Sequence, residues 1–168
     1  DRPVVTVANA DVAFCAGDTG VAISGTATGG TGSGTYTFHW EPTQGLADAF
    51  SATTTASPTI TTVYELYATD ANNCVSDPGI VTVTVHELPV PNAGADQYTC
   101  NQTPVQLQGS ATGGSGNYSF SWTPSAHLDN PTSATPNAAP DTSIVYTLTV
   151  TDITTACAPP MVKTRSTP

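Results

Sequence analysis

Residues 28–40 read Thr-Gly-Gly-Thr-Gly-Ser-Gly-Thr-Tyr-Thr-Phe-His-Trp, and this stretch decides the fold because it occurs twice. Residues 112–122 read Thr-Gly-Gly-Ser-Gly-Asn-Tyr-Ser-Phe-Ser-Trp, and in both places a proline follows the final Trp with one residue between them. Trp40 and Trp122 lie 82 residues (122 − 40) apart, and later Leu, Tyr and Asp positions repeat with the same spacing. A period this long and regular indicates two copies of one small domain.

The composition of the chain favours strands over helices. Thr-rich alternating segments with Gly and Pro between them suit strands and turns, and no stretch of about a dozen residues has a 3.6-residue apolar period. We therefore predict an all-β chain with one domain at residues 1–87 and a second at residues 88–168. Domains of roughly 80 residues bury a limited fraction of their surface, so a covalent staple is expected in each.

The charge and the distribution of apolar residues exclude two classes of partner. The chain carries 13 Asp and Glu against 3 Lys and Arg, for a net charge of −10, and the basic residues are Arg2, Lys163 and Arg165. Such an acidic body repels phosphate backbones, so nucleic-acid binding is not expected. No apolar run approaches the roughly 20 residues that span a bilayer, so membrane insertion is not expected either.

Alternation within the repeated stretch predicts which side chains form the core. In residues 36–40 every second residue is aromatic and the residues between are polar, which places three rings on one face of a strand. A sandwich needs its largest side chains inside, although three rings at this period also suit a carbohydrate-stacking platform. A second alternating strand follows at residues 64–70. The predicted core residues are Tyr36, Phe38, Trp40, Tyr64 and Leu66 in the first copy, and Tyr118, Phe120, Trp122, Tyr146 and Leu148 in the second.

Three segments outside these strands need separate interpretation. The Gly-rich stretch at residues 29–34 lacks the Lys and the following helix of a phosphate-binding loop, so we interpret it as a turn whose residues need positive φ. Residues 59–61, Thr-Ile-Thr, are the candidate for a short edge strand. The final strand of the second copy, near residues 161–165, is more polar than its counterpart at residues 80–85.

Four cysteines fall at equivalent places in the two copies. The separations within each copy are 59 (74 − 15) and 57 (157 − 100) residues, which favours Cys15–Cys74 and Cys100–Cys157 among the three sets of pairings. Closing such a loop stabilises a domain by roughly 4 kcal/mol in the chain-entropy account. Free buried thiols are an alternative, and zinc is disfavoured because no C-x-x-C or H-x-x-x-H spacing occurs. Disulfides indicate an oxidising compartment, hence an extracellular or cell-surface location.

The order of these signals resembles a known family. The second copy reads T-G-G-x-G-x-Y-x-F-x-W-x-P, and the first copy has the same order with two more residues before its Tyr. In both copies a Leu near Asp or Asn follows, then Y-x-L-x-x-T/V-D and a Cys. This order is similar to the PKD-like and Ig-like repeats of large surface or secreted proteins of gliding, type IX-secreting bacteria. The resemblance implies two tandem immunoglobulin/PKD-like antiparallel β-sandwiches. It also implies a non-catalytic spacer, adhesion or fibre-forming role. The W-D-F-G-D-G of the better-known PKD signature is absent, so properties tied to those acidic residues are not carried over.

Few residues suit a metal or a reaction. Acidic and amide side chains recur near the cysteines, and oxygen-rich loops can hold Ca²⁺. However, no spaced D-x-D-x-D run is present, and Asp and Asn are also common turn residues. No other cofactor is expected, and the absence of a nucleophile–base motif such as G-x-S-x-G argues against an enzyme. The Ca²⁺ candidates are Asp11, Asp70, Asn72, Asp96 and Asp152.

These features favour a non-catalytic extracellular module with a structural or adhesive function. Both chain ends carry Pro-containing extended sequence like the connection at residues 86–91, so we expect a segment of a longer array or a subunit of a head-to-tail fibre. Its partners would be neighbouring repeats or copies of itself, with Arg2, Lys163 and Arg165 as junction contacts. Equally, Lys163 and Arg165 would serve to blunt an edge strand against aggregation.

The alternative function is a carbohydrate-binding accessory region of a secreted hydrolase. Alternation places the Tyr67 ring outward, and we take Phe50 and Tyr98 as two further aromatic residues that could contact a ligand. Aromatic rings on a surface are typical contacts for sugars and for other proteins. The partners under this alternative are surface glycans or proteins.

Overall fold

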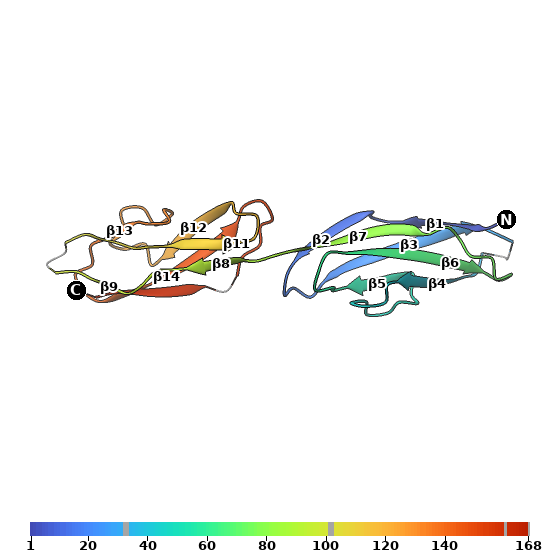
Figure 1. Cartoon of the computed structure of the whole chain (residues 1–168), viewed down its shortest axis with the longest axis horizontal. Helices are drawn as coiled ribbons and strands as arrows, with labels where there is room; N and C mark the ends of the chain where they lie inside the picture. The colour runs from blue at the N-terminus through green and yellow to red at the C-terminus, as the bar shows by residue number, and fades with distance from the viewer. Residues whose placement is uncertain (32–33, 101–102, 160, 168) are drawn as a thin grey trace. The chain divides into compact units, whose positions relative to one another are not determined.

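The computed structural model describes residues 1–31, 34–100, 103–159 and 161–167, with the backbone alone for residues 163–167. Within this range the chain consists of strands joined by turns and loops (Figure 1). None of the described residues form a helix long and apolar enough to cross a membrane. The all-β prediction is confirmed.

The chain divides into two compact units, Asp1–His86 (unit 1) and Glu87–Pro168 (unit 2). The division lies one residue before the one expected from the sequence. Each unit has its own hydrophobic cluster, made of residues from that unit alone.

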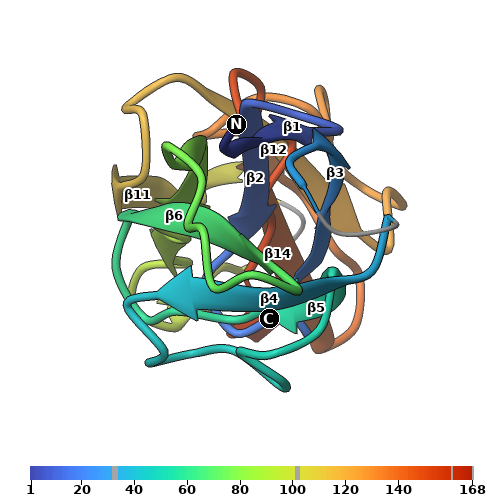
Figure 2. The same ribbon diagram turned by 90° about the vertical axis from the view of Figure 1, so that its right-hand side faces the viewer.

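Unit 1 is a sandwich of a three-stranded sheet, in the order β1-β3-β5, and a four-stranded sheet, in the order β2-β7-β6-β4. Figure 2 gives the view of this unit from the side of the N terminus. Neighbouring strands are antiparallel, except that β2 runs parallel to β7. The strands are β1 (Pro3–Val7), β2 (Asp11–Cys15), β3 (Val21–Gly29), β4 (Tyr36–Glu41), β5 (Thr53–Ala56), β6 (Thr62–Asp70) and β7 (Gly79–His86).

The core of unit 1 lies between the two sheets, as the alternation requires. Trp40 in β4 lies opposite Leu66 in β6, and both are completely buried together with Tyr64. The Trp40 indole N–H donates to the carbonyl of Ser51 at 2.9 Å, and the Tyr64 hydroxyl donates to the carbonyl of Gln44 at 2.8 Å. Both large rings therefore bury their apolar area without leaving a polar atom unpaired.

Unit 2 repeats this architecture with shorter strands. Its sheet β12-β14-β15-β9 corresponds to the four-stranded sheet of unit 1, and β9 runs parallel to β15 as β2 does to β7. The opposite layer consists of the pairs β11-β8 and β10-β13. The strands are β8 (Pro89–Asn92), β9 (Gln97–Tyr98), β10 (Val105–Gln106), β11 (Ser110–Gly113), β12 (Tyr118–Thr123), β13 (Asn137–Ala138), β14 (Ile144–Asp152) and β15 (Val162–Thr167).

The residues expected in the core fall into two groups. Phe38, Tyr118 and Phe120 are half-buried and pack against the edge of a cluster. Tyr36 is half-buried too, and its hydroxyl donates to the carbonyl of Gly29 at 2.7 Å. These four lie in the first half of β4 or β12, toward the end of the sandwich. The fully buried group is Trp40, Tyr64, Leu66, Trp122, Tyr146 and Leu148.

The short edge strand of unit 1 is β5, at Thr53–Ala56, and not residues 59–61 as the sequence suggested. Thr54 and Ala56 point into the core, while Thr53 and Thr55 are exposed. Ile60 is instead 73% exposed in a loop. The strand therefore forms where small side chains fit against the core, at Thr53–Ala56. The high β-propensity of Ile60 does not place it in a strand, because packing has the larger effect.

Candidate functional sites at the unit ends and on one sheet face

A buried aspartate in unit 2 ties two loops together at one end of the sandwich. Asp152 is the last residue of β14 and is completely buried. Its carboxylate accepts the backbone N–H of Ser115 at 2.5 Å and the Ser115 hydroxyl at 2.7 Å. It also accepts the N–H groups of Thr154 at 2.9 Å and Thr155 at 3.2 Å. One side chain therefore joins the Gly-rich loop to the turn that follows β14.

Unit 1 contains the same device at Asp70, the last residue of β6. Its carboxylate accepts the backbone N–H groups of Thr31 at 3.1 Å, Asn72 at 2.9 Å and Cys74 at 2.9 Å. The side chain is 4% exposed. Asp70 thus links the Gly-rich loop to the turn that carries Cys74, as Asp152 does for the turn before Cys157.

We name the two ends of each unit by the course of the chain. The leading end carries the buried aspartate, and the first strand starts there, since Pro3 pairs with Gly29 in unit 1 and Pro89 with Gly113 in unit 2. The trailing end is the opposite end of each unit. There β7 ends at His86 in unit 1, and β15 ends at Thr167 in unit 2.

The second glycine of the Gly-Gly pair in each repeated motif lets the Gly-rich loop come close to the buried aspartate. Gly30 has φ +75° and Gly114 has φ +56°, values that side chains rarely adopt. A Cβ atom on Gly30 would lie 2.8 Å from Asp70 Oδ2, and one on Gly114 would lie 2.6 Å from Asp152 Oδ2. The sequence signal for this arrangement is a Gly-Gly pair and an aspartate that repeat together.

These hydrogen bonds favour the charged form of both carboxylates. The backbone N–H of Ser115, followed by its hydroxyl, lowers the pKa of Asp152 from 3.8 to about 2, against the opposing effect of burial. The backbone N–H of Thr31, followed by that of Cys74, likewise lowers the pKa of Asp70. Both groups therefore act as anionic acceptors that organise the leading end.

The Ca²⁺ candidates are not brought together at one point. Asp11 lies in β2 opposite Thr82, away from the leading end, and Asp96 precedes β9. The oxygens of Asp70 and Asp152 already accept backbone N–H groups. Among the described residues, no three His, Cys, Asp or Glu side chains come close enough to hold a metal ion.

We expect Asp152→Asn to change how unit 2 responds to acid. A carboxylate with a lowered pKa adds stability that is fully present above its unfolded pKa near 3.8 and is lost as the pH falls through about 2. The amide does not titrate, so the variant should be less stable at pH 7 and lose less stability between pH 4 and 2. Denaturant midpoints measured over this range in a Trp40→Phe background, where Trp122 reports on unit 2, test this. Equal pH slopes in the two proteins would contradict the assignment.

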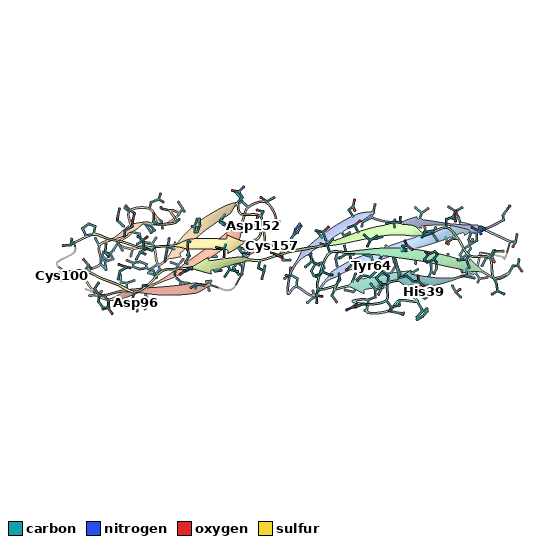
Figure 3. The ribbon with its side chains drawn as sticks, viewed as in Figure 1. His39, Tyr64, Asp96, Cys100, Asp152 and Cys157 are labelled. Carbon is teal, nitrogen blue, oxygen red and sulfur yellow. The ribbon has the colours of Figure 1, made fainter. Side chains whose placement is uncertain are left out.

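The cysteine pairings predicted from spacing are corrected by the structure. Cys15 and Cys157 are disulfide-bonded, whereas Cys74 and Cys100 are free thiols. The physical reason is that the two cysteines of each unit lie at opposite ends of it. Figure 3 shows this for Cys100 and Cys157 in unit 2. Equal separations along the chain therefore did not indicate proximity.

The outer face of the β4–β6 pair in unit 1 carries an aromatic and acidic patch. His39 lies opposite Tyr67 in the register, and the His39 and Phe50 rings meet edge to face with centroids 5.0 Å apart. The Tyr67 hydroxyl donates to Glu65 at 2.5 Å, which raises the pKa of Tyr67, and Glu41 lies 3.6 Å from His39 Nε2. Phe50 is 69% exposed. We call His39, Phe50, Tyr67, Glu41 and Glu65 the aromatic face.

The described residues of unit 2 carry no aromatic ring at the positions equivalent to His39, Phe50 and Tyr67. Ser121 stands at the position of His39, Thr149 at that of Tyr67 and Thr132 at that of Phe50. Ser121 and Thr149 lie opposite each other in the β12–β14 pair, as His39 and Tyr67 do in β4–β6. Tyr98 lies in β9 and is 77% exposed. The aromatic face is therefore a feature of unit 1.

A groove of about 470 Å³ lies on unit 1 beside the loop that follows β4. Its walls include Pro42, Gln44, Pro58 and Ile60, and none of the described residues that line it is charged. Such walls offer van der Waals contact and a few hydrogen bonds to a ligand.

The structure describes the side chain of only one of the three basic residues expected at junctions, Arg2. Arg2 Nη1 lies 3.3 Å from Asp77 Oδ1 within unit 1, with both side chains largely exposed, so this ion pair contributes little stability. Lys163 and Arg165 lie in β15, opposite Thr147 and Val145, and their side chains are outside the described part of the structure.

Comparison with solved structures assigns the fold. A three-Ig fragment of titin matches with a TM-score of 0.56 and 12% identity, over 99% of this chain and 66% of that one. Immunoglobulin domains 1–5 of Sidekick-1 match with 0.53 and 14%, over 99% and 39%. A C-terminal fragment of intimin, in complex with the intimin-binding domain of its translocated receptor, matches with 0.53 and 13%, over 98% and 63%. The chain thus spans 39% to 66% of the length of these matches.

No protein-family profile matches the chain, and no curated protein matches it in sequence. The structural likeness, at identities of 12–14%, establishes the fold alone. The chain is therefore a tandem of immunoglobulin-like β-sandwich domains.

Proposed function

We propose that this chain is a non-catalytic structural and adhesive module of an extracellular protein, acting as a segment of a longer array or as a subunit of a head-to-tail fibre. The observation that carries the proposal is the repetition of structure. Both units pair Trp with Leu in the same register, at Trp40–Leu66 and Trp122–Leu148. Repeated sandwiches of this kind serve by reach and by the surfaces they present.

The connection inside the chain supports serial joining. Only Glu87 and Leu88 separate the finish of β7 from the start of β8 at Pro89. The last strand of unit 2 corresponds to β7, and the first strand of unit 1, which starts at Pro3, corresponds to β8. If a further copy followed, its β1 would come after β15 in the same way that β8 comes after β7 within this chain.

The cellular location and the family are part of the same proposal. Disulfide-bonded Cys15 and Cys157 are suited to an oxidising compartment, which supports an extracellular or cell-surface location. The T-G-G-x-G-x-Y-x-F-x-W-x-P motif supports kinship with the PKD-like and Ig-like repeats of gliding, type IX-secreting bacteria. The structure of the leading end gives that motif a physical role in folding.

The size of the native protein tests this function. An antibody raised against this chain should detect, in the surface or secreted fraction of the source cells, a polypeptide much larger than 17.1 kDa or an assembly of such chains. Light scattering and electron microscopy of the purified chain separate the two versions, since only the fibre subunit grows with concentration. A native 17.1 kDa monomer at every concentration would contradict both.

The aromatic face favours carbohydrate binding as a second candidate, in keeping with an accessory region of a secreted hydrolase. Exposed rings beside carboxylates can stack on a sugar and accept its hydroxyl groups. The matched test replaces His39, Phe50 and Tyr67 with the residues of unit 2, as His39→Ser, Phe50→Thr and Tyr67→Thr. A glycan array should show binding that the triple variant loses by at least about tenfold, which corresponds to roughly 1.4 kcal/mol. Absence of binding by the unmodified chain would remove this candidate.

A further inference from the structure

Each unit carries one cysteine at its trailing end and one at its leading end. Cys15 lies opposite His86, the finish of β7, and Cys100 follows β9, which pairs with the finish of β15. These are the trailing-end cysteines. Cys74 and Cys157 lie in the turns after β6 and β14, beside the buried aspartates, and are the leading-end cysteines.

One cysteine of each kind is disulfide-bonded and the other is free. The bonded ones are Cys15, at the trailing end of unit 1, and Cys157, at the leading end of unit 2. The free ones are Cys74, at the leading end of unit 1, and Cys100, at the trailing end of unit 2. The bonded cysteines thus belong to the two unit ends that the connection at residues 87–88 joins, and the free cysteines belong to the two ends that it does not join.

Cys74 is held in the backbone pose of its bonded counterpart. The carbonyl of Cys74 accepts the N–H of Asp70 at 3.1 Å, and the carbonyl of Cys157 accepts the N–H of Asp152 at 2.9 Å. The residue before each cysteine has positive φ, +60° at Asn73 and +61° at Ala156. The two turns differ in length by one residue, yet they present the cysteine in the same way.

Cys100 is likewise held as Cys15 is. The carbonyl of Cys15 accepts the N–H of Asp18 at 3.0 Å, and the carbonyl of Cys100 accepts the N–H of Thr103 at 3.0 Å. Cys100 is exposed and Cys74 is half-buried. Both free thiols are therefore placed as half-cystines and are accessible to an incoming partner.

The partner of a free thiol cannot come from its own unit. The eight residues of β7 run between the turn of Cys74 and the level of Cys15, a span of roughly 25 Å at about 3.3 Å per residue. A disulfide needs Cα atoms within about 7 Å of each other. The same argument separates Cys100 from Cys157, which Figure 3 shows at opposite ends of unit 2.

We propose that a second copy of this chain supplies the partner, so that Cys100 of one copy forms a disulfide with Cys74 of the next. This inference rests on the head-to-tail version of the proposed function and gives it a covalent lock. The oxidant is a small disulfide such as oxidised glutathione. The Cys74 thiolate attacks it and releases one glutathione, and the Cys100 thiolate of the other copy then attacks the Cys74 sulfur and releases the second. Two protein thiols lose two protons and two electrons, and the oxidant is reduced to two thiols.

Mixing two single variants tests the pairing. Cys74→Ser keeps only the Cys100 thiol, and Cys100→Ser keeps only the Cys74 thiol. In oxidised glutathione, an equimolar mixture should give a disulfide-linked dimer at least about tenfold faster than either variant alone, because matched ends raise the effective concentration of the two thiols. The unmodified chain should give a ladder of oligomers on a non-reducing gel. Peptic peptides should contain Cys74 bonded to Cys100. Dimers of a single variant that form as fast as the mixed dimer would overturn the proposal.

Two further measurements keep the outcomes separable. Alkylating the folded chain with N-ethylmaleimide blocks both thiols without a substitution. Because the ladder depends on these thiols, alkylation should abolish it. Light scattering of the double variant, Cys74→Ser with Cys100→Ser, measures assembly without the disulfide. Assembly of the double variant, together with like-with-like dimers in the single variants, would overturn the lock and leave the fibre function standing. A ladder that persists after alkylation would overturn the assignment of the thiols.

Discussion

Trp122→Ala should lower the free energy of unfolding of unit 2 by about 3–5 kcal/mol and leave unit 1 folded. Trp122 is 1% exposed and lies opposite Leu148, so its removal opens a large cavity between the two sheets. The change also strips the carbonyl of Ser133 of its partner, since the indole N–H donates to it at 3.0 Å. Small domains have total stabilities of about 5–15 kcal/mol, so this loss brings unit 2 close to unfolding.

Each unit holds one tryptophan, which makes the measurement specific. In Trp122→Ala the remaining Trp40 reports on unit 1 by fluorescence, and amide hydrogen exchange resolved by peptide reports on unit 2. Trp122→Phe is the matched control, since it keeps an aromatic ring in the core and loses the N–H to Ser133. It should cost less than the alanine variant. Equal protection of unit 2 in Trp122→Ala and in the unmodified chain would contradict the cavity argument.

The core was predictable because burial follows from side-chain chemistry and strand period. Trp40, Tyr64, Leu66 and their counterparts repeat with one spacing and alternate with polar residues, which identifies the buried face without a structure. The half-burial of Tyr36 was not predictable in the same way. Alternation says which face a residue occupies, but not how near that residue lies to the end of the sandwich.

The role of the aspartates was only partly predictable. Asp70 and Asp152 stood out by their repetition, and carboxylates near loops suggested Ca²⁺. Most of the groups that satisfy them are backbone N–H groups, such as those of Thr31 and Ser115, and a backbone donor leaves no mark on residue type. The accompanying glycine pair was the available signal, because Gly30 and Gly114 lie where a Cβ would strike the carboxylate.

The cysteine pairing failed for a topological reason. Near-equal separations of Cys15 from Cys74 and Cys100 from Cys157 describe the chain, whereas a disulfide depends on distance in space. Strand order determines which end of the sandwich each cysteine occupies, and it places the two cysteines of a unit at opposite ends. The same topology puts the aromatic rings of Tyr67 and His39 together, although their positions along the chain gave no indication of a shared surface.

Leu66→Ala should lower the free energy of unfolding of unit 1 by about 2–5 kcal/mol, and adding Gly25→Ala should return part of that loss. Leu66 is completely buried, and a Cβ atom on Gly25 would collide with Leu66 Cδ2 and lie 3.1 Å from the carbonyl oxygen of Thr6. Gly25→Ala alone should therefore cost about 1–3 kcal/mol through overpacking. When Leu66 is shortened, the obstructing methyl group is gone and the new Cβ occupies part of the cavity. The double variant should be more stable than the sum of the single changes predicts.

Unit 2 supplies the matched control, because the leucine methyl is the nearest obstacle at Gly25 but the most distant of the three at the equivalent Gly109. A Cβ atom on Gly109 would collide with the carbonyl oxygen of Ala134 and lie 2.7 Å from Trp122 Cζ2, while Leu148 Cδ2 is 3.3 Å away. A backbone carbonyl and a rigid indole do not withdraw when Leu148 becomes Ala. Leu148→Ala with Gly109→Ala should thus be additive or worse, whereas the Leu66 and Gly25 pair should compensate. Denaturant unfolding of the four single and two double variants measures both coupling energies. Equal coupling in the two units would show that the leucine methyl is not what limits the space at Gly25.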